Sequence, residues 1–199
     1  MMKQKLNQGL NQKLCDEKIA AAGKLAVCTV YDKDEAVGLA KKLVERGVFA
    51  MEIAYRNPEK LEQTDEAIRA VRKEVPEMLV GAATVTSLSL ARRAVKSGAQ
   101  FALSPGFDRE VVRWCKKHSF PFYPGVLTPS EVLAAKQEGL TLLKFFPAES
   151  FDGVKILGGY RGPFPDVKFI VSGGLNAQNQ GAYSALKNVV CVSGSWLSE

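Results

Sequence analysis

Three features of the sequence predict an α/β protein built as a (β/α)8 barrel. Eight short apolar runs of strand length recur roughly every 20 to 28 residues, as expected for strands that alternate with helices. A helix cap or a glycine stop lies between successive runs. No run is typical of an exposed edge strand, as expected if the sheet closes into a barrel and has no edges. An open doubly wound sheet would share the early part of the pattern. We expect a single-domain TIM barrel over residues 24–199 and an N-terminal helix within residues 1–23.

Caps, stops and periodicity place the individual elements. Residues 3–22 suit one amphipathic helix ended by Gly23, with an apolar side made of Leu6, Leu10, Leu14 and Ile19. Apolar runs predict strands at 24–30, 48–54, 78–82, 100–104, 120–123, from 142, at 167–171 and at 189–192. Helices are expected at 32–46, 57–75, 86–98, 108–117, 128–139, 153–157 and from 176.

The composition is ordinary for a globular protein, with 46% hydrophobic and 24% charged residues in a chain of 199. No apolar run approaches the roughly 18 residues of a membrane span, and no secretory leader is expected, so we predict a cytoplasmic protein with no membrane partner. The net charge of +6 arises from basic residues spread among acidic ones on helix faces, which argues against a nucleic-acid partner. Four scattered cysteines and one histidine predict reduced thiols and no metal site.

A lysine lies at the centre of the strand-length apolar run 142–149, LLKFFPAE. Because strands alternate their faces, Leu142, Lys144 and Phe146 are expected to point one way, and Leu143 and Phe145 the other. Burial favours a neutral amine, which is a nucleophile towards carbonyl carbon, so Lys144 is a candidate for Schiff-base chemistry. The alternative is an edge-strand lysine that extends its ammonium group to water.

The second strand ends in a carboxylate and a guanidinium of the same parity. Glu52 and Arg56 flank Ala54 and should enter the barrel mouth together, where the chemistry of such barrels is found. A glutamate near a nucleophilic lysine can move the protons of imine formation, and an arginine can bind a substrate carboxylate. The alternative is a structural salt bridge between Glu52 and Arg56.

Small residues recur at the same ends of the other strands. The segments 81–84, 104–106 and 124–125 are GAAT, SPG and PG, which admit a ligand close to the backbone or simply form turns. The seventh and eighth strands end in 172–174, SGG, with a helix expected near Asn176, and in 193–195, SGS. Loops at these two positions are the usual phosphate site of a barrel.

In this order and spacing the motifs EIAYR, VGAATV, SPG, PGVLTPSE, KFFPAE, GPFP, SGG and GSW resemble one known family. The chain is similar, from about Lys24 onward, to the class I aldolases that cleave 2-keto-3-deoxy-6-phosphogluconate (KDPG) and 2-keto-4-hydroxyglutarate (KHG) to pyruvate and an aldehyde. The resemblance implies a (β/α)8 lyase of carbohydrate metabolism that needs no metal or other cofactor, is typically a homotrimer, and takes a small keto acid, phosphorylated in the case of KDPG.

The resemblance also implies residue roles. Lys144 would be the Schiff-base lysine and Glu52 the general acid and base. The residues implied in substrate binding are Arg56 and Thr84 for the carboxylate, Pro105 and Phe146 for the pocket lining, and Ser172, Gly173, Gly174 and Ser195 for the phosphate end.

Three departures from the family pattern bear on these expectations. Ala83 replaces the second glycine of GAGT, which adds a methyl group near the carboxylate pocket, and Ala54 and Ser172 replace two threonines. The family continues past GSW with a final helix, whereas this chain has only Leu197, Ser198 and Glu199, so the last outer helix is expected to be missing. Strand eight would then be covered by the N-terminal helix, a neighbouring subunit or further residues. An alternative function is a catalytically impaired relative that serves as a sugar-phosphate-binding or assembly subunit.

Overall fold

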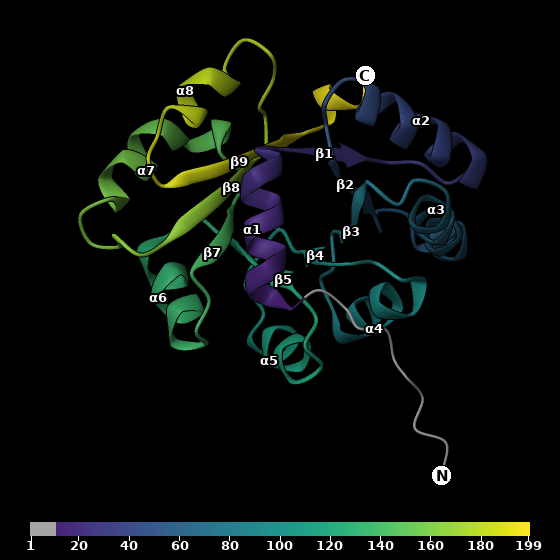
Figure 1. The fold of residues 1–199 in the computed structure, drawn as a ribbon. Coiled ribbons are helices and arrows are strands. Elements are labelled where there is room, and N and C mark those ends of the chain that lie inside the picture. The colour runs from purple at the N-terminus through teal and green to yellow at the C-terminus, as the bar shows by residue number, and fades with distance from the viewer. Residues whose placement is uncertain (1–10) are drawn as a thin grey trace.

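The computed structural model describes residues 11–199, in which parallel strands form a nearly closed barrel surrounded by helices (Figure 1). Neighbouring strands follow the order β5-β4-β3-β2-β1-β9-β8-β7-β6, so the sheet begins and ends on adjacent segments of the chain. The strands are β1 (Lys24–Cys28), β2 (Ala50–Ala54), β3 (Leu79–Ala83), β4 (Ala102–Leu103), β5 (Phe122–Tyr123), β6 (Gly125–Val126), β7 (Leu142–Phe145), β8 (Lys168–Ser172) and β9 (Val189–Gly194).

The predicted fifth strand, 120–123, is present as β5, and a second short piece, β6, continues it beyond the predicted end. Pro124 separates them, and a proline has no N–H with which to continue a ladder. One piece pairs with β4 and the other with β7, so this segment joins the two ends of the sheet. The prediction of a (β/α)8 barrel is therefore confirmed, with its fifth strand divided.

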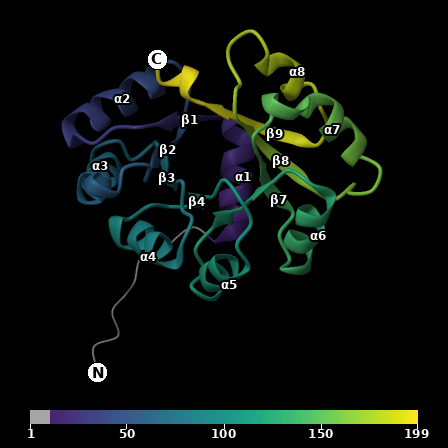
Figure 2. The same cartoon turned by 180° about the vertical axis from the view of Figure 1, so that it is seen from behind.

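Eight α-helices lie within residues 11–199, and seven of them follow strands on the outside of the barrel (Figure 2). Asp32, Asp108 and Thr128 cap α2, α5 and α6 as expected, and Thr128 forms a capping box with Glu131. Asn57 caps a 3-10 turn, η1 (Pro58–Lys60), that runs into α3. The helices are α1 (Gln12–Ala22), α2 (Lys33–Glu45), α3 (Leu61–Glu74), α4 (Leu88–Ser97), α5 (Arg109–Lys117), α6 (Pro129–Gln137), α7 (Gly153–Tyr160) and α8 (Gln180–Ser184).

The core has two parts, which lie on opposite faces of the strands. Leu142 belongs to a cluster inside the barrel, whereas Leu143 and Phe145 belong to the layer between the strands and the outer helices, so the predicted alternation is confirmed. The interior cluster comprises Leu25, Ala50, Leu79, Phe101, Leu103, Tyr123, Leu142, Ile170 and Cys191, together with Cys15 and Ile19 of α1.

Helix α1 lies across one end of the barrel (Figure 1). Its Asp16 accepts a hydrogen bond of 2.8 Å from the hydroxyl of Tyr123, and its Gln12 side chain accepts one of 3.1 Å from the amide of Phe122. The predicted apolar side of this helix was partly wrong, because Leu14 is 42% exposed while Cys15 and Ile19 are buried. Leu6, Leu10 and the predicted start of the helix lie outside the described residues.

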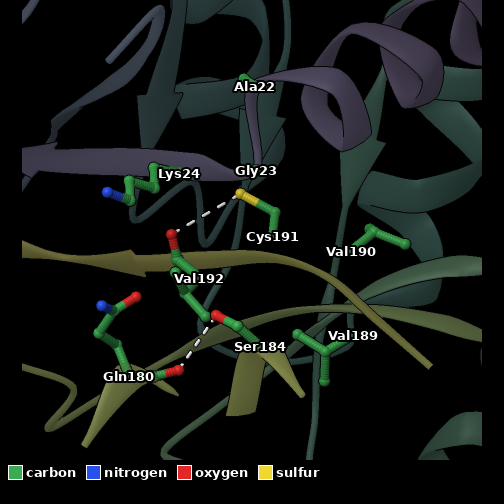
Figure 3. A pocket seen from close by; sticks show the side chains of 9 residues that line it. All are labelled: Ala22, Gly23, Lys24, Gln180, Ser184, Val189, Val190, Cys191 and Val192. Atoms are coloured by element: carbon green, nitrogen blue, oxygen red, sulfur yellow. Dashed lines mark hydrogen bonds between the residues drawn. The ribbon is translucent and has the colours of Figure 1, made fainter. Parts of the chain in front are cut away.

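The surface beside β9 is partly open. Within the described residues, β9 is followed only by a 3-10 turn, η3 (Ser195–Leu197), and Val189 and Val190 remain partly exposed. A groove of about 280 Å³ runs along β9 between α8 and the turn from α1 to β1 (Figure 3). Helix α1 packs against interior residues at the barrel end, and only its last residue, Ala22, lines this groove. The lining residues are Ala22, Gly23, Lys24, Gln180, Ser184, Val189, Val190, Cys191 and Val192.

Candidate active site

The barrel brings Lys144 of β7 and Glu52 of β2 into contact inside its wall. Lys144 Nζ lies 3.5 Å from Glu52 Oε1, and the two side chains are 8% and 0% exposed. Strand β7 has a neighbour on each side, β6 and β8, so the alternative of a solvent-exposed edge-strand lysine is wrong. The ring of Phe146 lies next to the amine, with its centre 5.5 Å from Nζ. A buried amine beside a carboxyl group is the pairing that imine chemistry requires.

The surroundings of Glu52 favour its protonated form. Burial is the largest influence and raises the pKa of this carboxyl group, while the nearby charges of Lys144 and Arg56 oppose that rise without cancelling it. Only Oε1 contacts Lys144; Oε2 is buried and has no hydrogen-bond partner among residues 11–199. One oxygen of the carboxyl group is thus directed at the amine, and the other is free to exchange a proton with a ligand.

Arg56 lies at the mouth of the barrel, two residues beyond the end of β2. Its Nη1 donates a hydrogen bond of 3.2 Å to Oγ1 of Thr29, which follows β1. Within the described part of the chain Arg56 forms no ion pair, and Glu52 pairs with Lys144 instead. The predicted alternative of a structural Glu52–Arg56 bridge is therefore wrong, and the exposed guanidinium can face an anion.

Thr84, directly after β3, has a backbone φ of 60°, in the left-handed region that a β-branched residue rarely adopts. Strained conformations of this kind are concentrated at functional sites, where the surrounding structure holds a side chain in a particular direction. Ala83 is buried and is in register with Ala54 on β2, so the two methyl groups lie on neighbouring strands below Thr84. The departure at Ala83 is accommodated without displacing the strand ladder.

The loop of Pro105 passes close to β6. A side chain at Gly125 would lie 2.2 Å from the carbonyl oxygen of Pro105, so this approach requires glycine. Gly125 is in register with Lys144 on β7. Pro105 and Phe146 are both half-buried. Phe146 lies next to the amine, and Pro105 approaches the strand beside it.

The loop after β8 is built around two glycines in the left-handed region. Gly173 and Gly174 have φ values of 99° and 82°, and a side chain on them would approach within 2.8 Å of Pro147 and 2.7 Å of Glu149. Glu149 binds this loop through its amide, which donates to the carbonyl of Gly173 at 3.0 Å, and its carboxylate accepts a hydrogen bond from Tyr183. The segment from Phe146 to Glu149 thus supports the loop.

One expectation about this loop was wrong. The sequence predicted a helix starting near Asn176, directly after the glycines, but α8 begins at Gln180. Asn176 and Asn179 instead form a turn in which each side chain accepts from the backbone amide of the other, at 3.0 and 2.7 Å. Ser172 is buried at the end of β8, and Ser195 is exposed at the start of η3, so both lie on the side of the barrel where the strands end.

The sequence reasoning missed Thr29, and it placed Ser193 only within the candidate phosphate loop 193–195. Thr29 orients Arg56, and no motif marks it. Ser193 is completely buried on β9, and its alternation with Cys191 was the available signal. Between residues 11 and 199, no group of three or more His, Cys, Asp or Glu side chains is arranged to hold a metal ion. No described helix is both long and apolar enough to cross a bilayer.

Comparison with known proteins identifies the family. The model of the KDPG and KHG aldolase family matches residues 15–199. The chain belongs to this aldolase family. It is 40% identical over 188 residues to the KHG/KDPG aldolase of Escherichia coli strain K12, an alignment that covers 94% of this chain and 86% of that protein. Aldolases are carbon–carbon lyases, so the family establishes the enzyme class.

Two solved aldolase structures share the fold of this aldolase. The KDPG aldolase of Legionella pneumophila, with pyruvate captured at low pH as a covalent carbinolamine intermediate, is 35% identical with a TM-score of 0.83, over 89% of this chain and 84% of that one. The KDPG aldolase of Zymomonas mobilis ZM4 with 3-phosphoglycerate is 30% identical with a TM-score of 0.83, over 93% of this chain and 86% of that one.

Proposed function

We propose that this aldolase cleaves KDPG, KHG or both to pyruvate and an aldehyde through a Schiff base on Lys144. The observation that carries the proposal is the buried contact of 3.5 Å between Lys144 Nζ and Glu52 Oε1, in which the carboxyl group keeps a second, unpartnered oxygen. The covalent pyruvate carbinolamine of the Legionella pneumophila relative supports this chemistry.

In the proposed reaction, the amine of Lys144 attacks the keto carbon, C2, and the keto oxygen becomes the hydroxyl group of a carbinolamine. Glu52 supplies the proton with which that hydroxyl group leaves as water, and an iminium ion remains. The iminium ion accepts the electron pair of the C3–C4 bond while the 4-hydroxyl group gives its proton to the Glu52 carboxylate and becomes the aldehyde. Protonation of the resulting enamine at C3 and hydrolysis of the imine release pyruvate.

Substrate binding follows from the groups around the barrel mouth. We propose that Arg56 and Thr84 bind the carboxylate, that Pro105 and Phe146 line the pocket, and that the phosphate end is bound by Ser172, Gly173, Gly174 and Ser195. The exposed guanidinium of Arg56 and the strained backbone of Thr84 support the first assignment. The two left-handed glycines leave their backbone amides open to an anion, and the Zymomonas mobilis relative was crystallised with a phosphorylated acid.

We further propose that the enzyme acts as a cytoplasmic homotrimer in carbohydrate metabolism, with its small-molecule substrate as its partner and without nucleic acid or membrane. The family resemblance supports the trimer, and the uncovered groove along β9 leaves surface that a neighbouring subunit could cover.

The test is pyruvate with borohydride, followed by peptide mass spectrometry. We expect a reduced adduct confined to the peptide that carries Lys144. The matched control is Lys168→Ala, which removes an exposed lysine from the adjacent strand β8 and should leave the adduct unchanged, whereas Lys144→Ala should abolish it. A folded wild-type protein that forms no adduct would refute the lyase proposal and favour the impaired binding subunit, for which the buried methyl group of Ala83 is the motivating feature.

A further inference from the structure

The interior of the barrel is arranged in layers, and one layer brings a third polar side chain beside Lys144 and Glu52. In an eight-stranded barrel of this kind each layer takes one residue from every second strand, because the strands are tilted and staggered. Lys144 is in register with Ile170 on β8, which is in register with Cys191 on β9. Because the strands are tilted, a layer that crosses two strands shifts by about two residues toward their carboxyl ends. The layer of Lys144 therefore takes Ser193 from β9 rather than Cys191.

The same step leads from Ser193 to Glu52. Ser193 is in register with Leu25 on β1, and Val27, two residues further along, is in register with Glu52 on β2. Lys144, Ser193 and Glu52 therefore belong to one layer, contributed by β7, β9 and β2. Two observations agree with this assignment. First, Glu52 contacts Lys144. Second, the pKa of the Cys191 thiol is raised chiefly by burial of the thiol and additionally by the charge of Glu52, and Cys191 lies two residues before Ser193 on the same face.

This layer contains two polar atoms whose hydrogen-bonding capacity is unused. Among residues 11–199, three buried side-chain oxygen or nitrogen atoms have no hydrogen-bond partner, and two of them are Glu52 Oε2 and Ser193 Oγ. Both side chains are completely buried. A buried hydroxyl group without a partner is unfavourable, because it has given up its hydrogen bonds to water and gained none. A partner that arrives with the ligand would remove this cost.

We propose that Ser193 is a further catalytic residue, whose hydroxyl group donates a hydrogen bond to the oxygen of the carbinolamine formed on Lys144. The inference rests on the proposed function, since it requires a carbinolamine. In the layer, Ser193 lies between the strand that carries the amine and the strand that carries the carboxyl group, so its hydroxyl group and Glu52 Oε2 can approach the same ligand oxygen from neighbouring positions.

The hydrogen bond assists the dehydration step. The C–O bond of the carbinolamine breaks, and its electron pair leaves with the oxygen, which takes the proton of the Glu52 carboxyl group and departs as water. The nitrogen lone pair forms the C=N bond, which leaves an iminium ion and a carboxylate. Ser193 keeps its own proton and holds the departing oxygen in line with Glu52, where a fixed donor is most effective because bulk water is excluded.

The test is the rate of imine formation with pyruvate alone, measured by rapid mixing and borohydride quenching at increasing times. We expect Ser193→Ala to form the Lys144 adduct about tenfold more slowly than the wild type at saturating pyruvate, as for the loss of one hydrogen bond in the reacting state. Its melting temperature should not fall, because this hydroxyl group has no partner within residues 11–199 in the free protein.

The matched control is Ser97→Ala. Ser97 is also a completely buried serine, but it lies on α4 outside the barrel, where its hydroxyl group donates a hydrogen bond of 2.8 Å to the carbonyl of Ala94. We expect this variant to lower the melting temperature and to leave the rate of adduct formation unchanged. The pair of variants separates a catalytic hydroxyl group from a structural one.

A wild-type rate of adduct formation in Ser193→Ala overturns the inference, and so does a slow rate accompanied by a loss of stability like that of Ser97→Ala. If the alanine variant does not fold, Ser193→Gly removes the same hydroxyl group and is read in the same way. The absence of any adduct in the wild type would instead refute the proposed function, and this inference with it.

Discussion

An alanine at position 125 would test the close packing beside Lys144, the proposed Schiff-base lysine. The added methyl carbon would lie 2.2 Å from the carbonyl oxygen of Pro105 and 2.3 Å from its carbonyl carbon. Both are backbone atoms, so no rotation of a side chain can relieve the contact, and the loop of Pro105 must move. Overpacking of this kind costs about 1–3 kcal/mol of unfolding free energy. In a chain of this size, each kcal/mol lowers the melting temperature by about 2–4 °C.

The loss of activity should exceed the loss of stability in Gly125→Ala. Gly125 is in register with Lys144, and Pro105 is a proposed wall of the substrate pocket, so displacement of the loop changes the space around the amine. Reacting groups that are misplaced by about 1 Å can lose on the order of a hundredfold in rate. The assay is pyruvate release from KDPG, coupled to lactate dehydrogenase and measured well below the melting temperature.

Gly158→Ala is the matched control for this variant. Gly158 lies in α7, and a methyl group there would meet nothing within 4 Å. Because alanine favours a helix over glycine, this variant should gain up to about 1 kcal/mol of stability and keep its activity. Wild-type melting temperature and turnover in Gly125→Ala would show that the loop of Pro105 does not approach β6 as described.

Four further predictions concern Glu52, Thr84 and Asp16. Glu52→Gln should lower kcat by roughly 10²- to 10⁴-fold, the usual contribution of a general acid and base, and turnover within threefold of the wild type would contradict its role. Because imine formation uses the proton of the Glu52 carboxyl group and the pKa of that group is raised, the rate of imine formation in the wild type should fall as pH rises through a midpoint above the ordinary carboxyl value of 4.5. A midpoint at or below 4.5 in a pH–rate profile would contradict this. Thr84→Gly removes the left-handed backbone strain, so calorimetry should show a higher melting temperature. The variant also removes a hydroxyl group, so its KM for the keto acid should be higher. An unchanged KM would show that Thr84 does not bind the substrate carboxylate. Burial raises the pKa of Asp16, so the folded state favours its protonated form, and the stability that it contributes is present below about pH 3.8 and lost as pH rises through the raised pKa. Urea titrations across that pH range should show that the free energy of unfolding falls less with rising pH in Asp16→Asn than in the wild type.

The burial of the lysine and of the carboxyl group was predictable from local sequence patterns. A lysine among apolar residues, placed by strand alternation on the same face as Leu142, was correctly predicted to be buried, and Glu52 was correctly predicted to share the barrel with it. Alternation is a property of the backbone, so parity can be read along a strand without knowledge of its neighbours. The partner of each group could not be read in this way. Arg56 was assigned to the mouth, but its contact with Thr29 depends on how far β1 and β2 extend.

The ends of helices were predicted best where a side chain supplies the signal. Asp32, Asp108 and Thr128 begin or precede helices because their oxygen atoms accept from free backbone amides, which is a local interaction. The predicted start of α8 was wrong because the side chains of Asn176 and Asn179 accept hydrogen bonds from each other's backbone amides in a turn. A turn and a helix start satisfy the same amide groups, so the sequence does not distinguish them. The prediction that Leu14 lies on the buried side of α1 was wrong. The direction from which α1 approaches the barrel end, rather than the periodicity of the helix, determines which face is buried.

By itself, the sequence determined the alternation of strands and helices, the glycine-bearing strand ends and the face of Lys144, since each depends on contacts between residues close together in the chain. Only the tertiary structure decided which side chains of separate strands share a layer. Strand register and tilt set the distance between Lys144 and Glu52, the approach of Pro105 to Gly125, and the placement of Ser193 on a strand that lies between the two that carry Lys144 and Glu52. Register arises from the closure of the whole barrel, which no single segment encodes.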